Sequence, residues 1–242
     1  MKKSRRYPAD CFRKIFTVDV PPDQISAARL YITACGLYEA RLNGEKAGDF
    51  VLAPGITDYK KRIQYQTIDV GALLKSGANT LEITLADGWY RGSCGAWGLK
   101  NQYGTETAVL AQLEITDCAG RRQIIGSDES FSWSDDGPVR FADNKDGEIV
   151  DAGMRPSYAG KAKVTHRSVI PSASDNVPLS EHERLSASLI TTPSGKTVLD
   201  FGQNIAGYIE LSIDAQGRGN GRSTLRRNAR KGRRTDAFQL PV

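Results

Sequence analysis

Apolar and polar residues alternate in short segments along most of this chain. In ARLYITACG, residues 28–36, Leu30, Ile32 and Ala34 fall on one face, which is the period of two that a half-buried β-strand shows. Further segments of this kind are FRKIFTVDV, IQYQTIDV, TLEIT, VLAQLEIT, RRQIIG and SFSW. Apolar residues do not keep the helical period of about 3.6 for more than a turn or two. The pattern therefore predicts an all-β chain that folds as a β-sandwich or jelly roll.

Turn-forming residues separate these segments and divide the chain. The dipeptide Asn43-Gly44 is the strongest short signal for a β-hairpin, and GALLKSGANT predicts a short connection with one helical turn. Pro, Ser, Asp and Asn cluster in IPSASDNVPLS, where we expect a domain boundary. The predicted organisation is an N-terminal extension over 1–11, a first sandwich over 12–170, a linker over 171–179, the start of a second β-sandwich over 180–217 and a basic tail over 218–242.

Charge and cysteine content restrict the partners of the protein. The 242 residues carry a net charge of +5, but eight of the 33 Lys and Arg residues follow residue 217, where Asp236 is the single acidic residue. Because a terminal run of like charge is usually solvated, we expect no nucleic-acid partner. No apolar run approaches the roughly 18 residues that cross a bilayer, so we expect no membrane partner. Four dispersed Cys and two His predict neither a zinc site nor a disulfide framework, and a reducing, cytoplasmic location is expected.

Several longer motifs, taken in order, resemble one enzyme family. The run ARLYITACGLYEARLNGEKAGDFVLAPGITDYKKRIQYQTIDV is followed by LADGWYRG, NQYG and VLAQLEI. Together they resemble the N-terminal region of bacterial α-L-rhamnosidases, which implies a jelly-roll, galactose-binding-like β-sandwich. The segments DGPVRFADNKDGEIVDAG and TVLDFGQNIAGYIELSI are similar to the part of the family's sequence that comes after that region. The match extends from about Phe12 to Ile213, so the resemblance covers most of the chain.

The resemblance implies a hydrolase family but no catalytic residue in this chain. Members hydrolyse terminal α-L-rhamnosyl groups with inversion, which requires two carboxylates roughly 6.5–9.5 Å apart. In the family these carboxylates lie in an (α/α)6 barrel that comes after the β-domains, and no residue here aligns with them. We therefore expect a fragment whose parent catalytic domain is missing. In the family, a further strand usually comes after the position of Ile213, and its sequence differs from the residues found here. We therefore expect the basic tail to be truncated or frameshifted.

The stretch from Leu85 to Tyr103 contains two of the three Trp residues and four Gly residues. In several relatives the first sandwich resembles a calcium-dependent rhamnose-binding module. An aromatic ring can cover the apolar face of a sugar while polar groups bind its hydroxyls, and glycine lets the backbone approach closely. The candidate carbohydrate-binding residues are Asp87, Trp89, Tyr90, Arg91, Trp97, Asn101 and Tyr103. The candidate calcium ligands are Asp58 and Asp87, whose carboxylates are hard oxygen donors.

Structural interpretations compete with these binding roles. Trp89 directly follows a predicted strand and can pack over the end of the sandwich instead of binding sugar. Trp97 can be a ligand platform or a packing residue. Arg91 can form a structural ion pair with Asp87 or with Asp58.

The acidic segment DNKDGEIVDAG, residues 143–153, superficially resembles a calcium-binding loop. It has no Glu at the twelfth position and no flanking helix pattern, so we interpret it as a turn and linker. The leading hypothesis is a non-catalytic α-L-rhamnosidase fragment with rhamnose-containing glycosides as partners. A free-standing lectin-like module and a gene fragment without function are the alternatives.

Overall fold

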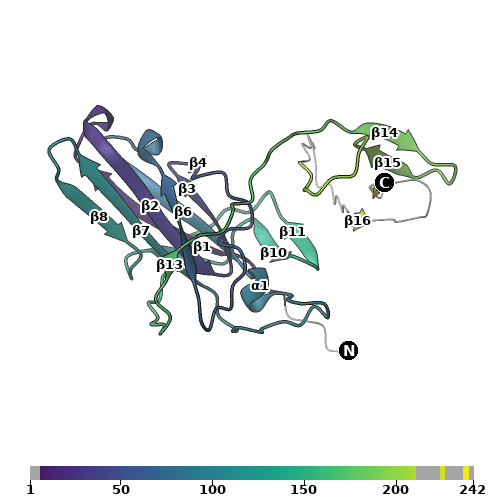
Figure 1. The fold of residues 1–242 in the computed structure, drawn as a ribbon, viewed down its shortest axis with the longest axis horizontal. Coiled ribbons are helices and arrows are strands. Elements are labelled where there is room, and N and C mark those ends of the chain that lie inside the picture. Colours follow the sequence, from purple (N-terminus) through teal and green to yellow (C-terminus); the bar gives the residue numbers. More distant parts are fainter. Residues whose placement is uncertain (1–5, 211–223, 227–236, 240–242) are drawn as a thin grey trace. The chain divides into compact units, whose positions relative to one another are not determined.

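The computed structural model describes residues 6–210 and the short strands at 224–226 and 237–239 (Figure 1). Two compact units divide the chain, Met1–Ser180 and Glu181–Val242. The strands of the first unit are β1 (Asp10–Val18), β2 (Ile25–Cys35), β3 (Leu37–Leu42), β4 (Glu45–Lys46), β5 (Gln64–Asp69), β6 (Gly77–Ala86), β7 (Ala108–Asp117), β8 (Arg122–Gly126), β9 (Ser132–Ser134), β10 (Val139–Asp143), β11 (Gly147–Val150), β12 (Gly160–Lys161) and β13 (Ser172–Ala173). Its helical segments are α1 (Gly88–Arg91) and the 3-10 turns η1 (Pro22–Gln24) and η2 (Gly71–Leu73).

Two large sheets form the first unit. One sheet has the strand order β12-β9-β1-β6-β3-β4, and the other has the order β13-β5-β2-β7-β8. Their pairings are antiparallel except for β13, which lies parallel to β5. Strands β10 and β11 form a separate two-stranded sheet beside them (Figure 1). The unit is therefore the all-β sandwich that the sequence predicts.

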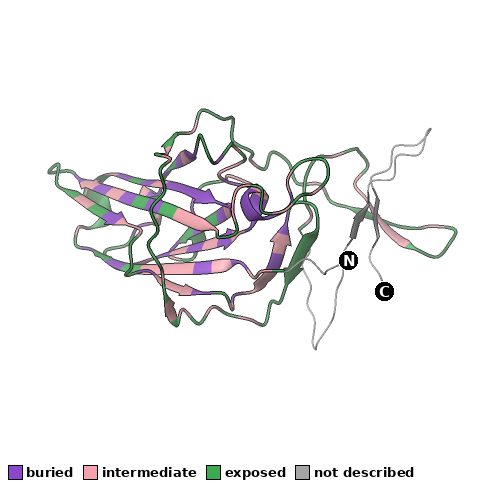
Figure 2. Cartoon of the chain, turned by 90° about the horizontal axis from the view of Figure 1, so that it is seen from below, coloured by how far each residue is buried: buried purple, intermediate pink, exposed green. Residues whose placement is uncertain are grey.

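The core lies between the two large sheets. Leu81 and Ile83 of β6 and Leu30 and Ile32 of β2 are at most 1% exposed and belong to one apolar cluster. Buried residues alternate with less buried ones along β6 and along β2 from Ala28 to Ile32, and Figure 2 shows this alternation of colours along strands of the sandwich. Because burial of one such side chain contributes roughly 1.5–3 kcal/mol, the alternation fixes which face of each strand points inward. The predicted inward face of β2 is confirmed.

The Asn43-Gly44 dipeptide forms the tight hairpin turn between β3 and β4. Both residues have positive φ, 56° and 88°, which a type I′ turn requires at its two central positions. The Asn43 side chain also donates through Nδ2 to Oδ1 of the fully buried Asn79 at 2.8 Å. The predicted single helical turn in GALLKSGANT is η2. Both predictions from turn residues are confirmed.

Two segments at the predicted domain edges pair with the sandwich. Strand β1 begins at Asp10, inside the range 1–11 that we assigned to an extension, and Ala9 N donates to the Val139 carbonyl at 3.0 Å. The range 171–179, assigned to a linker, contributes β13 to the edge of β5. Backbone pairing at a sheet edge needs no apolar side chains. These polar segments therefore lack the alternation of apolar and polar residues from which a strand is predicted.

The second unit contains β14 (Ser188–Thr191), β15 (Thr197–Asp200), β16 (Thr224–Arg226) and β17 (Ala237–Gln239) in the sheet order β14-β15-β17-β16. The predicted second β-domain over 180–217 is described as far as residue 210 and holds β14 and β15. Residues 211–217 lie outside the described part of the chain. The predicted basic tail over 218–242 also lies outside it, apart from the backbone of β16 and β17.

All four cysteines are free thiols, and two of them are buried. Burial raises the pKa of Cys11 to about 11 and also raises the pKa of Cys35. Because the thiolate is the reactive form, a raised pKa makes these two thiols weaker nucleophiles than an ordinary cysteine. Over the described residues, the structure contains no helix of the length and hydropathy that a membrane span needs.

Candidate functional site

The candidate site begins where β6 ends and the chain turns into α1. Gly88 has a φ of +54°, and a Cβ at this position would lie 2.8 Å from the Leu37 side chain. Only glycine fits this turn. The single turn of helix α1 places Arg91 four residues after Asp87, and the two side chains form an ion pair at 2.6 Å. This helical turn is too short to produce a periodic signal, so the sequence pattern did not predict it.

The Asp87–Arg91 pair is inside the protein. The two side chains are only 8% and 9% exposed, and Arg91 also covers the ring of Tyr7 at 4.4 Å. Burial raises the pKa of Asp87, and the adjacent guanidinium of Arg91 opposes that shift. The interpretation of Arg91 as the ion-pair partner of Asp87 is therefore confirmed. Both residues support the base of the loop.

Three tyrosines pack together next to this ion pair. Tyr90 is buried and contacts Tyr59 edge-on at 5.2 Å between ring centroids, and it stacks on Tyr103 at 6.4 Å. Its hydroxyl accepts a hydrogen bond from Nη1 of Arg167 at 2.7 Å. A Cβ on Gly104 would lie 2.3 Å from that hydroxyl, so the chain passes close to the ring. Tyr90 therefore has packing partners on several sides, whereas Tyr103 remains partly exposed.

The Trp97 loop, residues 92–104, carries the exposed part of the site. Its tip is a small hairpin in which Cys94 and Leu99 exchange two backbone hydrogen bonds at 3.0 and 3.1 Å. Gly95 and Gly98 flank the turn with positive φ. Trp97 stands at this turn with 88% of its surface exposed. The sequence left two interpretations of Trp97 open, a packing residue or a ligand platform. Its ring is not buried in the structure, which is the arrangement that a platform needs.

The remaining two predicted binding residues, Asn101 and Trp89, do not line the tip of the loop as Trp97 does. Asn101 is exposed, has a φ of 59°, and donates from its backbone N to the Arg91 carbonyl at 3.0 Å. Trp89, in α1, is partly buried. Their roles in sugar binding stay predictions, as do those of the other five candidates.

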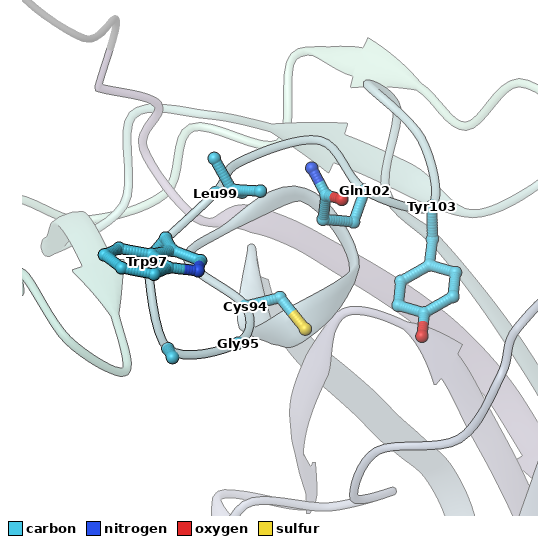
Figure 3. Close-up of a pocket in the computed structure, with 7 residues that line it drawn as sticks. Cys94, Gly95, Trp97, Leu99, Gln102 and Tyr103 are labelled. Atoms are coloured by element: carbon cyan, nitrogen blue, oxygen red, sulfur yellow. The ribbon is translucent and has the colours of Figure 1, made fainter.

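A pocket of about 260 Å³ opens beside Trp97 (Figure 3). The lining residues are Cys94, Gly95, Ala96, Trp97, Leu99, Gln102 and Tyr103. Pockets that enclose drug-sized ligands usually measure roughly 300–1,000 Å³, so this one suits a single small ring. Cys94, Leu99 and Gln102 were missed in the sequence because the small hairpin that brings them together depends on backbone pairing.

The two candidate calcium ligands each have a cation partner in the protein. Asp58 lies 3.6 Å from Lys61 and accepts a hydrogen bond from the backbone N of Lys60 at 3.2 Å, while Asp87 pairs with Arg91. Among the described residues, no group of three or more His, Cys, Asp or Glu side chains could hold a metal ion. Calcium binding stays a prediction.

Fold and loop together define a class: an all-β sandwich module with a small aromatic pocket at one end. Residues 23–190 match the family model of the α-L-rhamnosidase N-terminal domain, and the chain belongs to this family. Its resemblance to α-L-rhamnosidases is therefore confirmed. An α-L-rhamnosidase of Streptomyces avermitilis is 39% identical over 207 residues, which is 80% of this chain and 20% of that protein. One of Formosa agariphila is 40% identical over 143 residues, or 59% of this chain and 15% of that protein.

Solved structures agree with this membership. The Streptomyces avermitilis α-L-rhamnosidase complexed with L-rhamnose matches 83% of this chain and 20% of its own, with 38% identity and a TM-score of 0.74. The native enzyme from Aspergillus terreus matches 99% of this chain and 30% of its own, with 31% identity and a TM-score of 0.85. The chain thus spans 15–30% of the length of these relatives.

Proposed function

We propose that the Trp97 loop binds a terminal α-L-rhamnosyl group of a glycoside and that the chain is the non-catalytic N-terminal part of an α-L-rhamnosidase. The observation that carries this proposal is the 88% exposure of Trp97 beside a pocket of one-ring size. A large aromatic ring held in water supplies apolar area without first having to leave a packed core. The solved relative from Streptomyces avermitilis holds L-rhamnose, which supports the sugar class.

The chemistry of the pocket suits a neutral sugar. Rhamnose has an apolar C–H face and a methyl group, which the Trp97 ring and the Leu99 side chain can cover. The Gln102 amide and the Tyr103 hydroxyl are donors and acceptors for sugar hydroxyls. All three of these lining residues beside Trp97 belong to the same short loop.

The pocket favours binding over hydrolysis. Inverting hydrolysis needs two carboxyl groups roughly 6.5–9.5 Å apart, one protonated and one ionised. The seven residues that line this pocket include no Asp or Glu. We therefore assign cleavage of the glycosidic bond to a catalytic domain of the parent enzyme and substrate retention to this unit.

Titration with L-rhamnose, followed by tryptophan fluorescence and calorimetry, tests the proposal. We expect saturable binding with a Kd in the millimolar range, because a single ring offers little area, and roughly 4 kcal/mol corresponds to 1 mM. Trp97→Ala should weaken binding about tenfold or more, since aromatic anchors carry most of the energy of small interfaces. Leu110→Ala is the matched control, because Leu110 is also exposed but lies on β7 outside the pocket.

Two further arms separate the alternatives. Repeating the titration with calcium and with a chelator tests the predicted metal dependence. Incubation with an aryl α-L-rhamnoside tests the non-catalytic assignment, and we expect no turnover above a heat-inactivated control. Unchanged fluorescence and heat at tens of millimolar rhamnose would show that the unit is a scaffold.

A further inference from the structure

The turn between β10 and β11 lies against the Trp97 loop. Asp143, at the end of β10, has a side chain that is 0% exposed. Its Oδ2 accepts a hydrogen bond from the backbone N of Ser93 in the loop at 2.8 Å. Its Oδ1 accepts bonds from the backbone N of Lys145 at 2.9 Å and of Asp146 at 3.0 Å. One carboxylate thus closes its own turn and holds the start of the loop.

Two lysines add further contacts between the Trp97 loop and the β10–β11 turn. Lys100, from the loop, lies 2.7 Å from Asp146 and 3.5 Å from Asp143. Lys145, from the turn, donates through Nζ to the carbonyl oxygen of Gly95. The loop is therefore tied to the β10–β11 turn at three points along its length, near residues 93, 95 and 100. We call Asp143, Lys100 and Lys145 the hairpin clamp.

The surroundings of Asp143 and Lys100 favour the charged form of both side chains. Burial alone would raise the pKa of Asp143, but the three backbone N–H donors outweigh burial and hold that pKa below its ordinary value. Burial opposes the charge on Lys100 as well, yet the hydrogen bond and charge of Asp146, together with Asp143, raise its pKa. Both groups are charged at neutral pH, where charge-assisted hydrogen bonds are the strong ones.

Close packing at the base of the loop leaves little freedom for other arrangements. A Cβ on Gly92 would lie 2.4 Å from the Gly88 carbonyl and 2.9 Å from Oδ2 of Asp143. The carboxylate is therefore in direct contact with the loop backbone. By contrast, a Cβ on Gly95, at the tip, would meet nothing within 4 Å. The contacts at the tip are therefore the Cys94–Leu99 backbone pairing and the hydrogen bond from Lys145 to the Gly95 carbonyl.

We propose that Asp143, Lys100 and Lys145 are positioning residues that hold the Trp97 ring ready for its ligand. This inference rests on the proposed function, because it assigns those residues a role in sugar binding. A loop with four glycines loses much conformational entropy when it orders. If contacts order the loop before the ligand binds, this entropy is not lost on binding, and the affinity is higher. Asp143 and Lys145, which belong to the segment 143–153 interpreted from sequence as a turn and linker, thereby acquire a role in positioning the loop.

The test is Asp143→Asn in the full chain, read by amide hydrogen exchange and by rhamnose affinity. The Asn amide replaces one acceptor oxygen with a donor, so Ser93 or the turn amides lose their partner. We expect the Ser93 amide to exchange about tenfold faster or more, and the segment 94–99 with it, while β6 stays protected. Rhamnose affinity should fall about fivefold or more. Asp151→Asn is the matched control, because Asp151 is an exposed carboxylate after the same hairpin that binds only its own turn at Gly153.

Lys145→Met provides a second variant that keeps Asp143 and its buried bonds. Lys145 is exposed, so this variant should fold even if Asp143→Asn does not. It should accelerate exchange at residues 95–98 and weaken rhamnose binding without altering Ser93. Unchanged exchange in both variants would overturn the clamp. Faster exchange with unaltered affinity would overturn the positioning role. A wild-type chain that binds no rhamnose, with exchange responding as expected, would instead overturn the proposed function and leave the clamp supported as a device that holds the loop.

Discussion

At the scale of single residues, the stretch after β6 contains both buried and exposed side chains among the candidates for sugar binding. Asp87, Tyr90 and Arg91 point inward and have partners inside the protein, whereas Trp97 is 88% exposed. Sequence alone identified all four as candidates because their chemistry suits sugar binding. What separates them is the one helical turn of α1, which brings Asp87 and Arg91 together at a spacing of four residues.

Replacing Arg91 with Met should destabilise the first unit by about 3 kcal/mol at neutral pH, because loss of one partner leaves a buried charge uncompensated. Urea unfolding followed by circular dichroism measures the change. Burial already raises the pKa of Asp87, and loss of Arg91 raises it further. The carboxylate therefore takes up a proton more readily, and the destabilisation should shrink as the pH falls.

Arg121→Met is the control for this prediction. Arg121 forms the same type of pair with Asp117 four residues earlier, but its side chain is 76% exposed. Asp117 keeps backbone bonds from Ala119 and Arg121 N–H after the change. We expect a loss below about 1 kcal/mol. Equal losses in the two variants would contradict the structural role of the buried pair.

At the scale of elements, turns decide how the strands pair. The Asn43-Gly44 turn between β3 and β4 was readable from the sequence because type I′ turns have a narrow residue preference. The turn between β10 and β11 was readable only as a turn, since its contacts with the Trp97 loop join residues 50 positions apart. The type of a turn can be predicted from its own residues, whereas the segment that a turn contacts depends on the whole fold.

Gly44→Ala should cost about 1 kcal/mol in the free energy of unfolding. The position has a φ of +88°, and a Cβ added there would meet nothing within 4 Å, so the cost is that of the left-handed backbone alone. Gly126→Ala, in β8, is the control, because its Cβ also meets nothing and its φ is not in the left-handed region. Thermal unfolding of both variants should show a lower Tm only for the first.

The contribution of Asp143 to stability should depend on pH. Its pKa in the folded protein is lowered below the unfolded value of about 3.9. The folded state therefore prefers the ionised form, so the stabilisation is fully present above about pH 4–5 and is lost as the pH falls through the folded pKa. Urea unfolding at neutral and acidic pH should show the gap between wild type and Asp143→Asn narrowing in acid. An unfolding free-energy difference that stays constant with pH would contradict the role of the ionised Asp143 carboxylate in stability.

At the scale of the whole molecule, the sequence predicted the fold class better than the site. Alternation of Leu30, Ile32 and Ala34 reflects burial on one sheet face, and that signal is strong because each buried side chain contributes energy. The pocket depends on Cys94 and Leu99 pairing through backbone atoms, which leaves no trace in side-chain pattern. For the same reason β13, a two-residue edge strand, could not be anticipated.

The second unit should promote association at high protein concentration. In β14, Leu189 is 72% exposed and Ile190 is 43% exposed, and apolar side chains on an edge strand favour pairing with another chain. Gel filtration with light scattering should show the average mass rising with concentration, and Leu189→Lys should reduce the rise. Leu110→Lys, on β7, changes an exposed apolar side chain on an inner strand of its sheet and should alter the mass less. A sharp monomer at all concentrations would contradict this expectation.

The clamp also sets an order of events during synthesis. Ser93 leaves the ribosome 50 residues before Asp143, which at typical translation rates is an interval of about 3–10 seconds. Throughout that interval the nascent chain already contains Trp97 but lacks the carboxylate that holds its loop. The contact that holds the Trp97 loop is thus completed late, after strands β1 to β9 have emerged.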